Sequence, residues 1–217
     1  MSAATAPVTH APPILWAAAR ALICTIFALF GEPSYIAWQH THRQSQRTLL
    51  LKWLRAGEAL MRHLLLIEAA AYAKPNTRPL LRERRARVRR LVTFEADKPE
   101  AWRVSFRCFA SVTRGPRKPR SPSPRRPRLS REERWCAEYW PKPKFYSAWP
   151  LALRAEAMLR AFNNPESCAR RLAARLHATP HRAASLTRHP PNLPHVIDNF
   201  VTLREHTGIA RRRFESG

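Results

Sequence analysis

The clearest periodic pattern in the chain is LLLKWLRAGEALMRHLLLIEAAAYA, residues 49–73. Apolar side chains recur there every three or four positions, which is the spacing of one face of an α-helix. This stripe consists of Leu50, Trp53, Leu54, Gly57, Leu60, Met61, Leu64, Ile67 and Ala71. Because Leu51, Leu65 and Leu66 widen the apolar face, the pattern predicts a helix that contacts two partners. We expect it to end a helical region that begins near Tyr35.

A second apolar stretch, from Ile14 to Phe30, precedes this region and is stopped by Gly31-Glu32-Pro33. On a helix, large side chains form one face, and the opposite face holds small ones with Arg20. The two faces are Leu15, Ala19, Leu22, Ile23, Ile26, Phe27 and Phe30, and Ala17, Arg20, Ala21, Cys24 and Ala28. Small residues allow close packing, which favours a core helix between neighbours. We therefore expect this stretch and residues 49–73 to form a helical hairpin.

Membrane contact remains open as an alternative for residues 14–30. Seventeen helical residues reach about 26 Å at a rise of about 1.5 Å each, slightly less than the ~30 Å hydrocarbon core of a bilayer. Arg20 makes a span costly, and no basic residue precedes the stretch as it would in a secretory signal.

The charge of the chain is strongly positive and concentrated in its middle. Lys and Arg number 39 against 15 Asp and Glu, a formal net charge of +24, of which residues 75–128 carry +13. Six arginines fall between Leu80 and Arg90, so a helix there is too charged to be buried. Such a field attracts polyanions.

Between Leu91 and Ala110 the apolar period changes to two, which is typical of a half-buried strand. Apolar residues from Trp102 to Ala110 alternate with Arg103, Ser105 and Arg107. Leu91–Ala96 is the predicted hairpin partner, and a helix must cover the apolar face because a lone hairpin is marginal in water.

The remaining boundaries follow from proline, charge and helix-start signals. Seven basic residues and five prolines between Arg114 and Arg128 predict an extended, disordered linker. Pro150, Pro165, Pro180 and Pro194 each begin a short helical pattern. The predicted fold is mainly α with a small β-hairpin. Its parts are a disordered lead-in (1–12), a helical hairpin with a basic helix and β-hairpin (13–112), a disordered linker (113–129), a short-helix region (130–208) and a basic tail (209–217). The last helix of the short-helix region is predicted to end at Gly208.

Local motifs for catalysis or metal binding are missing from the sequence. It contains no Gly-x-Ser-x-Gly, His-Glu-x-x-His, phosphate-loop lysine motif or Gly-x-Gly-x-x-Gly. The pairs His40/His42 and His177/His181 lack nearby acidic or thiol ligands, which favours surface histidines. Four widely separated cysteines read as free thiols of a reducing compartment. We expect no enzyme, no cofactor and no metal.

Polyanion binding is the function that the sequence favours. The expected phosphate-binding residues are Arg82, Arg84, Arg85, Arg87, Arg89, Arg90, Arg103, Arg107, Arg117, Lys118, Arg120, Arg125, Arg126 and Arg128. Trp102, Phe106 and Phe109 interleave with these charges as stacking surfaces do. Nucleic acid is the first expected partner of a cytoplasmic protein. The alternatives are an anionic membrane surface, and an acidic protein partner or a second copy bound through the apolar helices 14–30 and 49–73.

Overall fold

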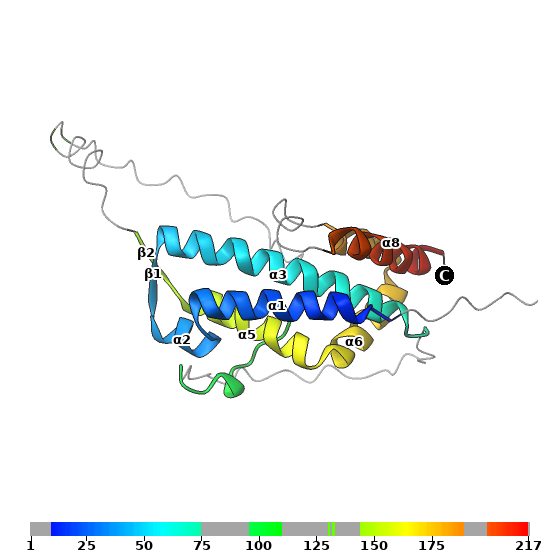
Figure 1. Cartoon of the computed structure of the whole chain (residues 1–217), viewed down its shortest axis with the longest axis horizontal. Helices are drawn as coiled ribbons and strands as arrows, with labels where there is room; N and C mark the ends of the chain where they lie inside the picture. Colours follow the sequence, from blue (N-terminus) through cyan, green and yellow to red (C-terminus); the bar gives the residue numbers. More distant parts are fainter. Residues whose placement is uncertain are drawn as a thin grey trace, which may run out of the picture.

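The computed structural model describes residues 10–74, 96–109, 130, 132, 144–188 and 199–216 (Figure 1). In chain order the elements are α1 (Pro13–Phe30), α2 (Pro33–Trp38), β1 (Thr41–Arg43), α3 (Gln44–Ala70), η1 (Pro99–Ala101), β2 (Phe145–Ser147), α5 (Trp149–Asn163), α6 (Pro165–Ala178), η2 (Pro180–Arg182), α7 (Ala183–Leu186) and α8 (Phe200–Ser216). Helices dominate the described residues, with one small two-stranded antiparallel sheet. The predicted class, mainly α with a small β element, is confirmed.

Helix α3 forms the centre of the core. It packs against α1, α5, α6, α7 and α8, so its wide apolar face has more than the two predicted partners. At Gly57 the helices α1, α3 and α5 approach closely: a Cβ there would lie 2.7 Å from Met158 Sδ and 3.5 Å from Ile26 Cδ1. The glycine inside the apolar stripe therefore makes room for two neighbouring helices.

Helices α1 and α3 form the predicted helical hairpin. Glu68, near the end of α3, accepts hydrogen bonds from the Ala11 backbone N–H (3.1 Å) and the Trp16 indole N–H (3.3 Å), and it pairs with His10 Nδ1 (2.8 Å). The start of α1 thus lies beside the end of α3, and the two helices run antiparallel (Figure 1). The prediction of disorder through residue 12 is wrong for residues 10–12, because Glu68 holds them.

Helix α1 is buried on one side only. Its large-residue face, including Leu15 and Ile26, lies in the core, whereas Ala17, Ala21, Cys24 and Ala28 are exposed. The predicted position between neighbours on both sides is therefore wrong within the described residues. By length and composition alone, Pro13–Trp38 is apolar enough to cross a membrane (mean hydropathy 2.0).

A polar segment, residues 39–43, separates α2 from α3 and contains β1, one of the two strands of the sheet. His40 adopts a positive φ of 55°, which reverses the chain, and its carbonyl accepts a bond from the Ala148 N–H (2.8 Å). Thr41, His42 and Arg43 then pair antiparallel with Ser147, Tyr146 and Phe145. The single helical region predicted from Tyr35 is wrong, because residues 39–43 offer no apolar side chain for a helix to bury.

The β-hairpin was predicted in the wrong place. Residues 103–107 form no ladder, and the sheet joins segments about a hundred residues apart instead of neighbours. The proposed partner strand lies outside the described residues, except for Ala96.

The C-terminal helices α5 and α6 and the 3-10 helix η2 each have a predicted proline in the first turn, at Pro150, Pro165 and Pro180. Helix α8 is longer than expected: it passes through Gly208 and continues to Ser216. The predicted basic tail is therefore helical over residues 209–216, because Ala210 and Phe214 are buried in the core and extend its apolar stripe. The basic stretch 80–90, the linker 113–129 and the start at Pro194 lie outside the described residues.

Candidate anion-binding site

The segment from Arg103 to Phe109 crosses the helices, and no described strand pairs with it. Its beginning is anchored, because Trp102 is buried and packs edge-to-face on Trp149, with ring centroids 5.5 Å apart. Arg160 of α5 donates hydrogen bonds to the carbonyl groups of Pro99 and Glu100 just before it. The helices thus hold this segment in place of a neighbouring strand.

Side chains of the segment alternate in burial, as the sequence predicts. Val104, Phe106 and Cys108 are partly buried against the core, whereas Arg103, Ser105 and Arg107 are exposed. The burial alternates although the segment pairs with no described strand. The prediction of an apolar face packed on helices is confirmed, although the hairpin is not.

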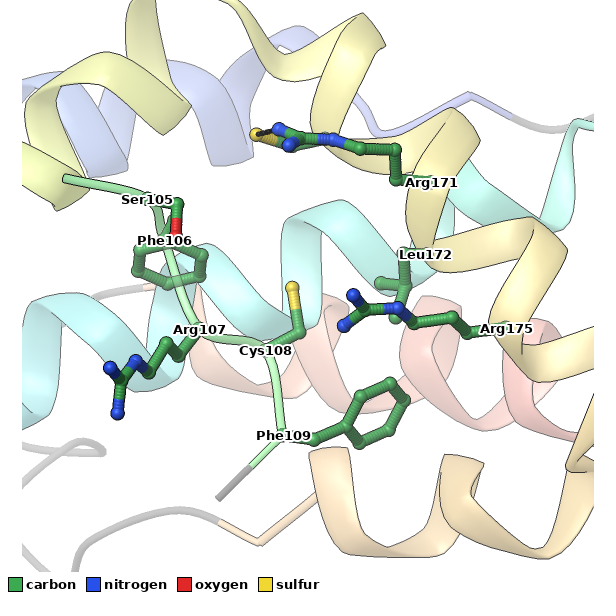
Figure 2. A pocket seen from close by; sticks show the side chains of 9 residues that line it. Ser105, Phe106, Arg107, Cys108, Phe109, Arg171, Leu172 and Arg175 are labelled. Carbon is green, nitrogen blue, oxygen red and sulfur yellow. Dashed lines mark hydrogen bonds between the residues drawn. The ribbon is translucent and has the colours of Figure 1, made fainter. Parts of the chain in front are cut away.

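Two cavities lie along this segment. One, of about 340 Å³, is lined by Ser105, Phe106, Arg107, Cys108, Phe109, Cys168, Arg171, Leu172 and Arg175 (Figure 2). The other, of about 540 Å³, is lined by Glu58, Arg62, Arg103, Val104, Ser105, Phe106, Arg107, Cys108, Phe109, Leu153, Arg154 and Ala157. Among the described lining residues, the first cavity has three guanidinium groups and no carboxylate, and the second has four guanidinium groups and one carboxylate.

The single carboxylate of these walls, Glu58, is occupied by two arginines. Arg154 binds it in a bidentate manner at 2.6 and 2.7 Å, and Arg62 lies 3.4 Å from the same carboxylate. This hydrogen bond from Arg154 to Glu58 raises the pKa of Arg154 above its ordinary value. Glu58 therefore has little capacity left to neutralise the other arginines.

Three arginines of the walls keep their charge available. Within the described residues, no carboxylate forms an ion pair with Arg103, Arg107 or Arg175. Figure 2 shows Arg175 pointing toward Cys108, and Arg107 pointing to the other side of the segment. Arg171 is oriented by the Ser167 carbonyl (3.1 Å) and by Cys168 Sγ (3.3 Å). Cations therefore project on both sides of the segment.

The thiol of Cys108 lines the cavity without adding charge to it. Burial, and secondarily the neighbouring Cys168, raises the pKa of the Cys108 thiol to about 11, against the opposing effect of Arg62, Arg175 and Arg171. At neutral pH the group is a protonated thiol and leaves the positive charge of the cavity unopposed.

The predicted stacking residues do not form an open aromatic platform. Trp102 is a core residue, 2% exposed, so its predicted role as a stacking surface is wrong. The guanidinium of Arg182 lies over the Phe109 ring, 5.2 Å from its centroid. Phe106 and Phe109 are partly buried and line both cavities beside the arginines.

Of the predicted phosphate-binding residues, Arg103 and Arg107 lie in this site. The others lie outside the described residues: Arg82, Arg84, Arg85, Arg87, Arg89, Arg90, Arg117, Lys118, Arg120, Arg125, Arg126 and Arg128. The structure adds Arg62, Arg171 and Arg175, which sequence reasoning missed. The spacing of Arg171 and Arg175, four residues apart on a helix that also has a buried stripe, was the available signal.

The histidine pairs are not all at the surface. His42 is 5% exposed, and burial lowers the pKa of its imidazole. His177 is half-buried: its Nε2 lies 3.2 Å from the Tyr72 carbonyl, and its ring packs edge-to-face on Phe214. The described part of the chain contains no group of three or more His, Cys, Asp or Glu residues that could hold a metal ion.

Comparison with known proteins finds no match for this chain among family models, curated proteins or solved structures.

Proposed function

We propose that this protein binds nucleic acid through its phosphate backbone, with the Arg103–Phe109 segment as the folded part of the binding surface. The observation that carries the proposal is the pair of cavities beside this segment, in which Arg103, Arg107 and Arg175 have no carboxylate partner among the described residues. Guanidinium groups present planar, paired donors that match phosphate oxygens.

Two further observations support a phosphate ligand over a base-reading mode. The arginines project from a segment that Trp102 and Arg160 hold against the helices, so the charges are positioned before binding. Of the three predicted stacking residues, Trp102 is buried and the guanidinium of Arg182 lies over the ring of Phe109. Contacts to phosphates carry no sequence information directly, so we expect binding with little sequence preference.

The same segment lies between the two most basic stretches of the sequence. Residues 80–90 contain six arginines, and residues 114–128 contain seven basic residues. In the sequence, further cations therefore both precede and follow Arg103 and Arg107. These stretches add affinity, and the segment supplies a fixed position.

The test is a fluorescence anisotropy titration of the full chain with labelled single-stranded and duplex oligonucleotides over a range of salt concentrations. We compare a triple variant, Arg103→Gln/Arg107→Gln/Arg175→Gln, with a control triple of equal charge, Arg20→Gln/Arg55→Gln/Arg212→Gln. The control residues are exposed and line neither cavity. The site triple should weaken binding at least tenfold more than the control and reduce the salt slope by about 2 to 3, since each phosphate contact contributes about 0.7 to 0.9.

Two results contradict the proposal. One is binding that does not depend on salt, or that falls equally in the two triples. The other is tighter binding of phosphatidylserine vesicles than of oligonucleotides at equal phosphate, lost in the site triple, which would assign the surface to an anionic membrane.

A further inference from the structure

A third cavity lies away from the arginines, at the end of α1. It has a volume of about 490 Å³ and lies among the last turn of α1, helix α2 and the start of α3. Phe27, Leu29 and Leu50 are among its apolar walls, and Gln39, Gln46 and His42 supply its polar groups. The described residues of its lining include no Asp, Glu, Lys or Arg. A volume of this size is typical of small-molecule sites.

The backbone turn at Gly31 shapes one wall of this cavity. Gly31 has a φ of 82° and ends α1, with its N–H donating to the Phe27 carbonyl (2.8 Å). A Cβ at this position would collide with the Tyr35 ring, so the absence of a side chain lets that ring lie against the turn. Tyr35 and Trp38 stack with their centroids 6.4 Å apart, and both are more than half exposed. The rim is therefore aromatic and open to solvent.

His42 is the polar group that points to a ligand. Its side chain is 5% exposed, and its Nε2 has no hydrogen-bond partner among the described residues. Buried polar groups are nearly always paired, so an unpaired one in a cavity wall calls for a partner. Burial lowers the pKa of the imidazole, so the ring is neutral at neutral pH and offers one donor and one acceptor.

We propose that this pocket binds an uncharged amphiphile, an apolar chain or ring ending in a hydroxyl or amide group that hydrogen-bonds to His42. The apolar walls accept the chain, and the polar end hydrogen-bonds to the imidazole once a neighbouring side chain moves, because His42 Nε2 is closed to solvent. A charged ligand is disfavoured, because the lining offers it no counter-ion. The proposal is independent of nucleic-acid binding.

The experiment is isothermal titration calorimetry of the full chain at pH 7.5 with three matched probes: 1-octanol, octanoate and octylammonium. We expect saturable binding of one octanol per chain, and at least tenfold weaker binding of the two charged probes. Ala28→Trp places a large ring at the pocket wall and should reduce octanol affinity at least tenfold. Its matched control is Ala21→Trp, since Ala21 is exposed on the same helix and lies outside the lining. The control should bind octanol as the unmodified protein does.

The role of His42 has its own pair of variants. His42→Leu should reduce octanol affinity about fivefold or more, because the chain is still accommodated but the hydroxyl loses its partner. His42→Gln should restore most of the affinity, since its amide both donates and accepts. Circular dichroism melts show whether each variant is folded before its binding is compared.

Several outcomes overturn the proposal. These are no saturable binding of octanol, equal binding of the charged probes, and equal losses in Ala28→Trp and Ala21→Trp. A dimer in native mass spectrometry that Ala28→Trp dissociates would assign the rim to a second copy of the chain. The triple variant at Arg103, Arg107 and Arg175 should bind octanol normally, so failure of either proposal is distinguishable from failure of the other.

Discussion

The cavities beside the Arg103–Phe109 segment and the cavity at the end of α1 share one helix but differ in charge. Helix α3 supplies Glu58 and Arg62 to the first region and Gln46 and Leu50 to the second. The first region has an excess of guanidinium groups, and the described lining of the second includes no Asp, Glu, Lys or Arg. A single core helix thus supports two surfaces that suit ligands of opposite character, an extended anion and a neutral amphiphile.

The largest effect on this contrast should come from Trp102→Ala. Removing a fully packed tryptophan costs about 3 kcal/mol, and it frees the segment that carries Arg103 and Arg107. We expect a lower free energy of unfolding in urea and weaker oligonucleotide binding, although no charge is removed. Trp38→Ala is the control, because Trp38 is 62% exposed and its loss should change stability by no more than about 0.5 kcal/mol. Equal destabilisation by the two variants would contradict this account.

Glu58→Gln should have the next largest effect and move stability and binding in opposite directions. It leaves Arg154 and Arg62 without their carboxylate in a half-buried position, at a cost of about 2 kcal/mol. It also removes the one negative charge of the cavity walls, so oligonucleotide affinity should rise. Glu166→Gln changes the charge equally at an exposed pair and should cost less than about 0.5 kcal/mol. Urea melts and anisotropy titrations measure both quantities, and a fall in affinity for Glu58→Gln would refute the role of Glu58.

A pH dependence should separate the neutral pocket from the basic side. Because burial lowers the pKa of His42, the unfolded chain binds a proton at this residue more readily than the folded one. Stability should therefore fall as the pH drops below the unfolded value of about 6.5, by at most about 1.4 kcal/mol per pH unit from this residue. In urea melts, the difference in the free energy of unfolding between pH 7.5 and pH 5.5 should be smaller for His42→Gln by the contribution of His42. An unchanged pH dependence in the variant would exclude His42 as its source.

The smallest expected effect concerns the thiol in the basic wall. With a pKa near 11, Cys108 should react with iodoacetamide at pH 8 far more slowly than the exposed Cys24, because only the thiolate reacts. Peptide mapping by mass spectrometry measures both rates in the same sample. Faster labelling of Cys108 than of Cys24 in the folded protein would contradict the burial of its thiol.

The sequence correctly predicted the features that depend on the residues of a single helix. The stripe through Leu50 and Leu64 predicted α3, and the prolines at positions 150 and 165 predicted the starts of two helices. These signals are local, since each comes from residues within a few turns of one another. The alternation at residues 103–108 was also read correctly as one buried and one exposed face.

The strands and the neutral pocket could not be predicted from the sequence. Each strand has three residues, too few for a period, and their pairing joins His42 to Tyr146 across the chain. The pocket lies beside backbone turns with positive φ at Gly31 and His40. A local sequence pattern does not predict how such turns place the neighbouring helices. Two arginines of the basic site, Arg103 and Arg107, were predicted because they belong to a charged stretch of the sequence. Arg62, Arg171 and Arg175 were missed because they lie on helices that were interpreted from their apolar stripes.

The pairing of β1 with β2 has a consequence for how the chain can be divided. It joins the α1–α3 half to the α5–α8 half, and α2 and α3 also pack against α5. A cut between residues 110 and 129 would interrupt no described helix or strand, so the contacts between the halves would be kept while their assembly becomes bimolecular and dependent on concentration. The two halves, produced as separate polypeptides, should therefore recognise each other and reassemble through that pairing and the helix contacts beside it.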